Sequence, residues 1–313
     1  MPITTEENFA YGQFVHDIAC QLGVFVPPNN NLVWHYTDGA GLMGILESGQ
    51  LFATQVSSLN DSKETLYARE LFIKAVRSVI RERQSDTQTV QFLNNVLDFL
   101  QEEYANPTQG ISKFFVTCFS EDRDSNDQWM KYSAQQTGKY AIGFHPHGLN
   151  REPNSSLYRV IYDPQKQEWA ARQLVEGTLR FYQEGLRGER LNDTAQWARE
   201  FYPAWDEWIY KLAPIAKAHK WESEHEYRIV HELRLSDFPK VRFSQKKTMI
   251  SRYLKLDFPS WVKERNSRLP IASVMLGPGS QHHTTKVSVR LLLDQMGYPD
   301  VPIETSDCTV TDR

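Results

Sequence analysis

An apolar segment at residues 32–34 leads directly into His35, Tyr36 and Thr37. The segment has the composition of a β-strand, and its polar end places three hydrogen-bonding side chains at the edge of a sheet. Binding sites in mixed sheets are often built at such strand ends. Packing or a bond to a buried carbonyl explains each residue alone, but the three together favour a site.

A strand–helix–strand unit begins at this point of the sequence. Residues 39–48 repeat apolar side chains at helical spacing, Gly49 can end that helix, and residues 51–53 predict a second strand. Strands mixed with helices predict an α+β domain over residues 32–303. Further strands are expected over residues 113–119, 139–144, 158–162, 225–235 and 271–276.

Three segments stand apart from the core of the predicted domain. Residues 1–31 contain an amphipathic helix and a hinge, and residues 304–313 form a polar tail. Residues 165–215 carry two long helical patterns rich in Trp, Glu, Arg and Gln. We therefore expect one α+β domain with a helical insertion over residues 165–215.

The composition argues against several classes of protein. A chain of 313 residues that are 40% hydrophobic can bury a substantial core. Its net charge of −4 argues against a strongly basic nucleic-acid-binding protein, although a local basic patch stays open. Three widely spaced cysteines give no disulfide framework. With no signal-peptide pattern and no apolar run of about 20 residues, we expect a cytoplasmic protein without a membrane span.

Two further segments supply polar or aromatic side chains. Asn60 belongs to an Asn-Asp-Ser-Lys-Glu run that is typical of a helix cap and can also face a cleft. Ser120 follows a predicted strand, and Trp129 and Tyr132 come next on one face of a short helix. Packing against the sheet and stacking on a ligand explain the two aromatic rings equally well.

A late acidic motif consists of Glu224, Glu226 and Arg228. In a strand these three side chains point to one face. Burying three charges without partners is costly. Either a Glu–Arg pair lies on a solvated edge strand, or the two carboxylates contact a sugar and stabilise a cation.

Patterns for metal or phosphate binding are weak. The pairs His145 with His147 and His282 with His283 lack a carboxylate or cysteine at metal-ligand spacing. The Gly-Pro-Gly run at residues 277–279 has neither the dinucleotide-binding nor the Walker spacing. The sequence therefore predicts no metal site.

Taken in order, the motifs resemble a bacterial family catalogued as domain of unknown function 2971. The resemblance covers about residues 32–280 and is interrupted by the helical segment at 165–215. The motifs that carry it are His35-Tyr36-Thr37, Leu59-Asn60-Asp61 with Glu64, Cys118-Phe119-Ser120, Trp129 with Tyr132, the strand Tyr140–Phe144, and Trp221 with Glu224, Glu226 and Arg228.

More distantly, the opening strand–helix–strand unit is similar to ADP-ribosyltransferases. This resemblance implies a split mixed sheet flanked by helices, with NAD bound as the substrate. It implies that His35 and Tyr36 bind NAD and that Glu226 stabilises the ribosyl cation. We expect Glu226, Glu224 and His35 to be catalytic. The expected NAD-binding residues are His35, Tyr36, Thr37, Asn60, Ser120, Trp129, Tyr132 and Arg228.

The sequence thus favours an NAD-binding enzyme that cleaves the nicotinamide–ribose bond. It would transfer ADP-ribose to a protein or nucleic-acid acceptor, or hydrolyse NAD, as a toxin or antiphage effector. The alternative is a non-catalytic sensor or scaffold of a defence system that binds a nucleotide or a protein, and a phosphodiesterase or nuclease ranks third. Catalysis requires His35, Tyr36 and Glu226 in one pocket, whereas a scaffold leaves Glu226 on a solvated edge.

Overall fold

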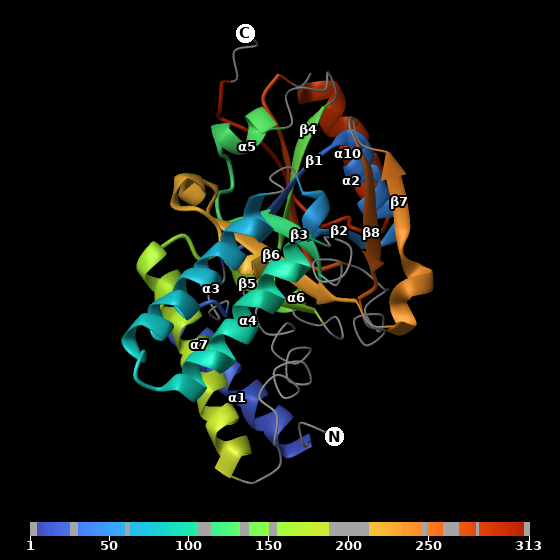
Figure 1. The fold of residues 1–313 in the computed structure, drawn as a ribbon. Coiled ribbons are helices and arrows are strands. Elements are labelled where there is room, and N and C mark those ends of the chain that lie inside the picture. The colour runs from blue at the N-terminus through green and yellow to red at the C-terminus, as the bar shows by residue number, and fades with distance from the viewer. Residues whose placement is uncertain are drawn as a thin grey trace. The chain divides into compact units, whose positions relative to one another are not determined.

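The computed structural model describes most of the chain (Figure 1). The described residues are 5–25, 31–59, 63–105, 114–131, 138–149, 155–187, 213–233, 235–245, 249–258, 269–279 and 282–309. Two of the predicted site residues, Asn60 and Tyr132, lie outside them.

Two compact units make up the structure, and each is assembled from three separate stretches of the chain. The helical unit comprises Met1–Phe25, Val56–Phe114 and Val160–His219. The sheet unit comprises Val26–Gln55, Phe115–Arg159 and Lys220–Arg313.

In the helical unit, one helix packs against two others. Its helices are α1 (Thr5–Leu22), α3 (Lys63–Glu82), α4 (Thr87–Ala105) and α7 (Pro164–Arg187), with the 3₁₀ turns η1 (Val56–Ser58) and η3 (Ala213–Ile215). Helix α7 packs against α1 and α3, and α3 packs against α4. Tyr11 on α1 shares a buried 3.0 Å hydrogen bond with Thr178 on α7, and the rings of Phe92 and Tyr182 stack 4.0 Å apart. The described part of the predicted 165–215 segment therefore packs with helices from two other stretches.

The sheet unit contains one sheet, to which the described residues contribute ten strands. These are β1 (Val33–Asp38), β2 (Leu51–Gln55), β3 (Phe114–Ser120), β4 (Lys139–Phe144), β5 (Ser155–Arg159), β6 (Glu226–Glu232), β7 (Arg242–Gln245), β8 (Ile250–Leu256), β9 (Ile271–Leu276) and β10 (Ile303–Thr305). The order is β10-β9-β4-β1-β3-β2-β8-β7, and the β5–β6 ribbon joins β3 through β6. Among the strand pairs whose register the described residues define, β9 and β10 are parallel and the others are antiparallel. The protein is thus α+β, with an open, mostly antiparallel sheet flanked by helices.

The two faces of the sheet are packed differently. We call one the core face, because α2 (Gly39–Ser48) and α10 (His282–Gln295) bury the main hydrophobic cluster on it. Its members include Val33, Leu42, Ile45, Leu46, Phe115, Phe119, Ile142, Phe144, Tyr227, Ile229, Val274, Val289 and Leu293. The opposite face carries a second cluster, which includes a tryptophan of α5 (Asn126–Lys131) and consists of Trp34, Tyr36, Trp129, Ala141 and Met275.

Local signals in the sequence explain the bounds of α2. The Asp38 carboxylate accepts a 2.7 Å hydrogen bond from the backbone N–H of Gly41, which caps the first turn. Gly49 has a left-handed φ of 63°, and its N–H donates to the Ile45 carbonyl. The prediction that Gly49 ends this helix is confirmed.

Residues that follow β10 are held by the loop that precedes α5. Residues 304 and 305 belong to β10. Ser306 Oγ donates a 2.6 Å hydrogen bond to one oxygen of the Asp124 carboxylate, and the backbone N–H of Asp307 donates at 2.8 Å to the other. The first part of the predicted polar tail therefore belongs to the fold of the sheet unit.

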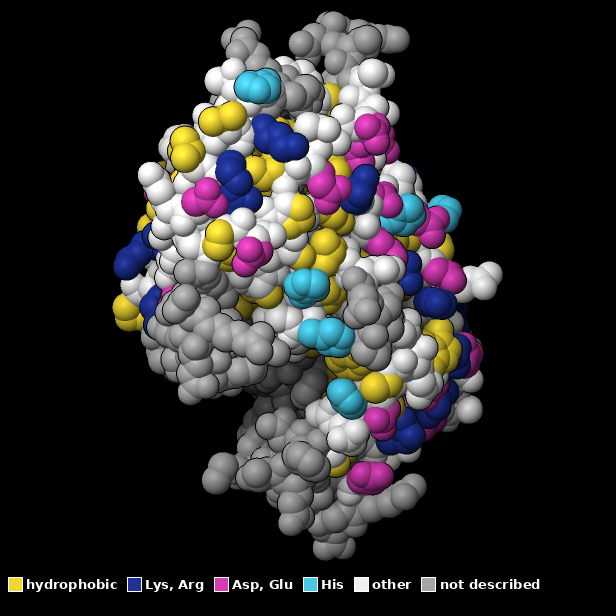
Figure 2. Space-filling model, turned by 180° about the vertical axis from the view of Figure 1, so that it is seen from behind, with side chains coloured by type: hydrophobic (Ala, Val, Ile, Leu, Met, Phe, Trp, Pro, Cys, Tyr) yellow, Lys and Arg dark blue, Asp and Glu magenta, His cyan; other side chains and the backbone are white. Residues whose placement is uncertain are grey.

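The surface has mixed charge. On the face shown in Figure 2, acidic and basic side chains are interspersed, in line with the small net charge of the chain. None of the helices in the described part of the chain is long and apolar enough to cross a membrane.

Candidate functional site

A buried ion pair lies at the start of β6. Arg228 donates to both carboxylate oxygens of Glu226, from Nε at 2.9 Å and from Nη2 at 2.8 Å. The Arg228 side chain is 1% exposed and that of Glu226 is 7% exposed. A planar, two-point contact of this kind fixes the orientation of the carboxylate. Its neighbours Tyr227 and Ile229 belong to the core face, so alternation along the strand puts the pair on the opposite face.

Glu224 supplies a second buried carboxylate two residues before Glu226 in the sequence. It ends the 3₁₀ helix η4 (His219–Glu224), and its side chain contacts Lys131 Nζ of α5 at 2.6 Å. Its backbone carbonyl accepts from Ser120 Oγ at 2.9 Å and from Gln128 Nε2 at 3.4 Å. The end of β3, helix α5 and the start of β6 therefore meet at Glu224.

His225 connects these two carboxylates through a backbone turn. It is the one non-glycine residue with positive φ in the described part of the chain, at 40°. Its Nδ1 lies 2.9 Å from Asp122 Oδ2, and its carbonyl accepts from the backbone N–H of Glu121. Left-handed backbone at a residue other than glycine is strained and is often found at functional sites. The side chains of His225 and Asp122 are 46% and 38% exposed, whereas Glu224 and Glu226, on either side of His225 in the chain, are buried.

The expectation that Glu224, Glu226 and Arg228 share one strand face is wrong for Glu224. The strand begins at Glu226, and the left-handed turn at His225 separates Glu224 from it. Glu224 therefore takes its direction from η4 and points to Lys131.

Tyr36 and Trp129 hold the loop between β3 and α5 in place. The Tyr36 hydroxyl donates to the Asp122 carbonyl at 2.8 Å and accepts from the backbone N–H of Ser125 at 3.1 Å. Its ring packs edge-on against Trp129, with centroids 4.7 Å apart. Trp129 is fully buried, and its Nε1–H donates to Asp124 at 2.6 Å. The structure gives Trp129 a packing role and leaves its ring no accessible face for a ligand.

His35 lies on the core face instead. It is opposite Ile142 in the register of β1 and β4, and its ring lies 5.7 Å from that of Phe119. Its Nδ1 lies 2.8 Å from the Cys118 carbonyl, which can only accept a hydrogen bond. Nδ1 therefore carries the proton, and Nε2 of the neutral ring is an acceptor.

Side-chain alternation thus separates His35 from the other predicted residues. His35 projects to the core face, whereas Tyr36, the next residue in β1, and Glu226 project to the opposite face. The expectation that His35, Tyr36 and Glu226 line one pocket is wrong. The structure instead brings Tyr36, Ser120, α5, Glu224 and Glu226 into one connected region.

Thr37 follows the alternation of β1 to the same face as His35. It is 8% exposed, and its Oγ1 would lie 2.0 Å from a Cβ atom at Gly41. Thr37 therefore lies against the first turn of α2, and Gly41 permits this close approach.

The partly buried position of His35 between the strands predicts a pH dependence of stability. Burial lowers the pKa of His35 below its ordinary value of 6.5, and the bond to Cys118 opposes part of this effect. Below pH of about 6.5 the unfolded chain then binds a proton that the folded chain does not, so stability falls as the pH falls. We expect wild type to lose more unfolding free energy than His35→Asn between pH of about 8 and about 5.5. Urea unfolding at both pH values measures this, and equal losses would exclude His35 as the titrating group.

Sequence reasoning missed four residues of the connected region. Asp122 and Asp124 lie in the acidic loop after β3, and Gln128 and Lys131 lie on α5. The available signal was the density of charge in residues 121–127, which falls between a buried strand and a short helix.

A second group joins a serine, a histidine and an aspartate. Ser155 Oγ lies 2.8 Å from His231 Nδ1, and His231 Nε2 lies 3.9 Å from Asp237 in η5 (Leu235–Lys240). These are the residue types of a hydrolytic triad. All three are under 9% exposed, and the distance to Asp237 exceeds a hydrogen bond. We interpret the group as a buried polar link between β5, β6 and η5.

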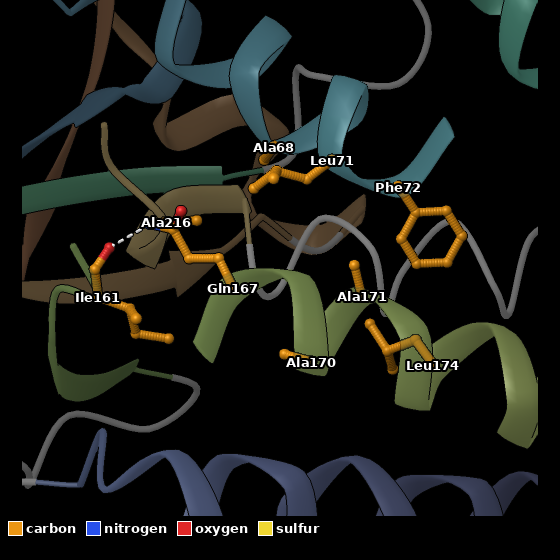
Figure 3. Close-up of a pocket in the computed structure, with 9 residues that line it drawn as sticks. All are labelled: Ala68, Leu71, Phe72, Ile161, Gln167, Ala170, Ala171, Leu174 and Ala216. Atoms are coloured by element: carbon orange, nitrogen blue, oxygen red, sulfur yellow. Dashed lines mark hydrogen bonds between the residues drawn. The ribbon is translucent and has the colours of Figure 1, made fainter. Parts of the chain in front are cut away.

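The helical unit has a small hollow between α3 and α7 (Figure 3). Gln167 closes one end, where it donates to the carbonyls of Ile161 and Lys217 and accepts from the Tyr67 hydroxyl. The volume of about 30 Å³ is of the order of one water molecule. The hollow is therefore a packing feature between helices, and its lining residues are Ala68, Leu71, Phe72, Ile161, Gln167, Ala170, Ala171, Leu174 and Ala216.

Metal-ligating side chains do not gather in the described residues. No group of three or more His, Cys, Asp or Glu side chains there is placed to hold a metal ion.

Comparison with known proteins gives a match over part of the chain. A family model described as "Protein of unknown function (DUF2971)" matches residues 128–229. That stretch runs from α5 to β6, and it includes Glu224, Glu226 and Arg228 but not His35. No curated protein and no solved structure matches the chain.

Proposed function

We propose that the region around Glu224 and Glu226 binds NAD or a related nucleotide and cleaves its nicotinamide–ribose bond. ADP-ribose would pass to a protein or nucleic-acid acceptor, or to water. The observation that supports this is a pair of buried carboxylates, Glu224 and Glu226, each held by a cation, on either side of the left-handed turn at His225. Such an activity suits a toxin or an antiphage effector.

The chemistry of this bond explains the need for a fixed carboxylate. As nicotinamide leaves, positive charge develops on the ribose carbon, and a preorganised negative group stabilises it. Arg228 holds both oxygens of Glu226, so the carboxylate needs little rearrangement in the transition state. In the proposal, Glu226 stabilises the ribosyl cation and Glu224 contacts the ribose or orients the acceptor.

The rim of the region offers groups for the anionic part of the substrate. Lys131 is 40% exposed and His225 is 46% exposed. A lysine ammonium and a histidine N–H are suitable donors for pyrophosphate oxygens. His35 is not part of this arrangement, because it lies on the core face.

The pairing of β1 also supports the resemblance to ADP-ribosyltransferases. In the described residues, β1 pairs with β4 along its whole length but with β3 only at Trp34 and Ser120. This limited pairing between two neighbouring strands is in line with the split sheet that the resemblance implies.

Glu226→Gln is the test of the proposed catalytic role. Gln keeps one oxygen for Arg228 but removes the charge, so we expect nicotinamide release to fall about a hundredfold or more. The melting temperature should also fall, because a buried ion pair is broken, and the assay is therefore run at a temperature where the variant is folded. Glu222→Gln, an exposed neighbour in η4, is the matched control and should keep the wild-type rate.

Two outcomes would contradict the proposal. Undiminished release by Glu226→Gln would reject Glu226 as the group that stabilises the cation. No release by wild type, with protein and nucleic-acid acceptors supplied, would reject cleavage altogether.

The burial of the carboxylates favours a second candidate, a non-catalytic nucleotide- or protein-binding module. Both Glu224 and Glu226 are under 10% exposed at the side chain, and each is already paired with a cation. Such pairs can have a purely structural role, in which they fix helix α5 and the turn at His225 and thereby position the exposed Lys131 and His225. Calorimetric binding of NAD without nicotinamide release would support this candidate.

A further inference from the structure

The β7–β8 hairpin concentrates positive charge in a chain that is acidic overall. Residues 238–256 contain six Lys or Arg residues and no Asp or Glu. The whole chain has a net charge of −4. Three of these cations, Arg242, Arg252 and Lys255, lie exposed on β7 and β8, and β7 is the last strand in the order of the sheet.

Two aromatic rings, one in the hairpin and one in the neighbouring strand β2, lie on the face opposite the core. Phe52 of β2 stacks on Tyr253 of β8, with centroids 5.1 Å apart and planes 28° from parallel. Phe52 is 43% exposed. The residues that alternate with these two in β2 and β8, Ala53 and Leu254, are buried on the core face.

A cation flanks each ring of this stacked pair. Lys255 lies opposite Phe52 in the register of β2 and β8, and its Nζ is 5.3 Å from the ring centroid. Arg242 lies opposite Tyr253 in the register of β7 and β8, and Nη1 donates to the Pro239 carbonyl at 3.4 Å. Both cationic side chains are exposed. We call Phe52, Tyr253, Arg242 and Lys255 the hairpin platform.

We propose that the hairpin platform binds single-stranded nucleic acid. Aromatic rings flanked by cations are the means by which proteins bind single strands without reading their sequence: bases stack on the rings, and phosphates contact Lys and Arg. The polyanion complements the charge of the hairpin. This inference goes beyond the proposed nucleotide cleavage and is tested without NAD, so either can fail while the other stands.

The other face of the hairpin also carries exposed side chains. Phe243 and Ile250 are each about two-thirds exposed, and Arg252 lies opposite Phe243. By alternation these three lie on the face opposite to Arg242 and Tyr253, and an exposed apolar and cationic surface of this kind is also suited to anionic lipid. The arrangement of cations beside stacked rings favours nucleic acid, and lipid is an outcome of the test.

The experiment measures binding of a fluorescein-labelled oligothymidylate by anisotropy over a series of salt concentrations. The main variant is Arg242→Gln/Lys255→Gln in the full chain. It should bind about tenfold more weakly at low salt, and the slope of log affinity against log salt should become shallower by about 1.4, because each phosphate that a cation neutralises contributes about 0.7. The matched control, Arg77→Gln/Lys166→Gln, removes two exposed cations from α3 and α7 and should bind as wild type does.

A second variant separates stacking from charge. Phe52→Ser should weaken binding about fivefold or more and leave the salt slope unchanged, because stacking on an aromatic ring contributes without an ionic interaction. Circular dichroism confirms that each variant is folded.

Three results would overturn the proposal. The first is wild-type affinity in Arg242→Gln/Lys255→Gln, and the second is equally weakened binding in the control variant. The third is weakened binding of the main variant to vesicles of phosphatidylserine and phosphatidylcholine with unchanged binding to the oligonucleotide, which would assign the hairpin to a lipid surface.

Discussion

Arg228→Ala is expected to destabilise the protein by about 3–5 kcal/mol, because it removes one partner of a buried ion pair. The Glu226 carboxylate keeps its buried position on β6 and loses two hydrogen bonds of 2.8–2.9 Å. The desolvation cost of that charge is then no longer offset by Arg228. Urea unfolding followed by circular dichroism measures the loss of stability.

Arg159→Ala is the matched control for this change. Arg159 ends β5, is 55% exposed at the side chain and contacts Glu121 at 3.5 Å. An exposed pair of this kind contributes under about 1 kcal/mol. A similar small effect for Arg228→Ala would show that the Glu226 carboxylate is compensated without Arg228.

A double variant tests whether the cost comes from the unpaired charge. Glu226→Gln/Arg228→Met removes both charges and keeps similar side-chain volumes. Replacing a buried pair by residues of matching size is often close to neutral. We therefore expect the double variant to be more stable than Arg228→Ala, and a further drop would indicate that the pair itself stabilises the fold.

Trp129→Ala is expected to cost about 3–5 kcal/mol, as is usual when a fully buried aromatic side chain is removed. Trp129 is 0% exposed and packs edge-on against Tyr36. It also lies against Gly277, where a Cβ atom would come within 2.9 Å of the indole and 2.6 Å of Lys139 Cβ. Because the surrounding backbone is packed this closely, the site cannot collapse fully to fill the cavity.

Trp129→Phe separates ring volume from hydrogen bonding. It keeps most of the packing and removes the Nε1–H bond to Asp124, a carboxylate that also holds Ser306 and Asp307. We expect a destabilisation of about 1–3 kcal/mol, smaller than that for alanine. Unfolding in urea ranks the two variants. Equal destabilisation would place most of the energy in the bond to Asp124 instead of the indole packing.

Local signals in the sequence predict local structure well here. The apolar run before His35 becomes β1, and Gly49 ends α2 with the left-handed backbone that glycine favours. Both outcomes depend on interactions within a few residues. The same holds for the strand around Arg228, although its first residue is Glu226.

The sequence pattern could not predict which residues come together in the candidate site. The triplet from His35 to Thr37 does not say which face each side chain takes, because this is fixed only by pairing with β4. Lys131 meets Glu224 across more than ninety residues of sequence, and a single left-handed residue, His225, turns Glu224 away from the strand. Hydrophobic periodicity predicts which side chains share one face of a helix or strand. It does not predict which other helices or strands that face will contact.

The same reasoning applies to the helices. The pattern at residues 165–215 predicts two long helices, and α7 (Pro164–Arg187) is helical as predicted, whereas residues 188–212 lie outside the described part of the chain. Its apolar face packs on α1 and α3, which come from distant parts of the chain. An amphipathic helix needs a partner surface, but its sequence does not identify that surface.

The interleaving of the two units has a consequence for how the protein is made. The chain passes between the units near residues 25, 55, 114, 159 and 219. During synthesis, the helical unit cannot complete its packing before α7 and η3 have left the ribosome. The sheet likewise cannot form in full before β9 and β10 have left it. Neither unit corresponds to a contiguous fragment that can be expressed alone. Pairing between distant stretches slows folding and leaves apolar surface exposed for longer, so the nascent chain should depend on chaperones more than its size suggests.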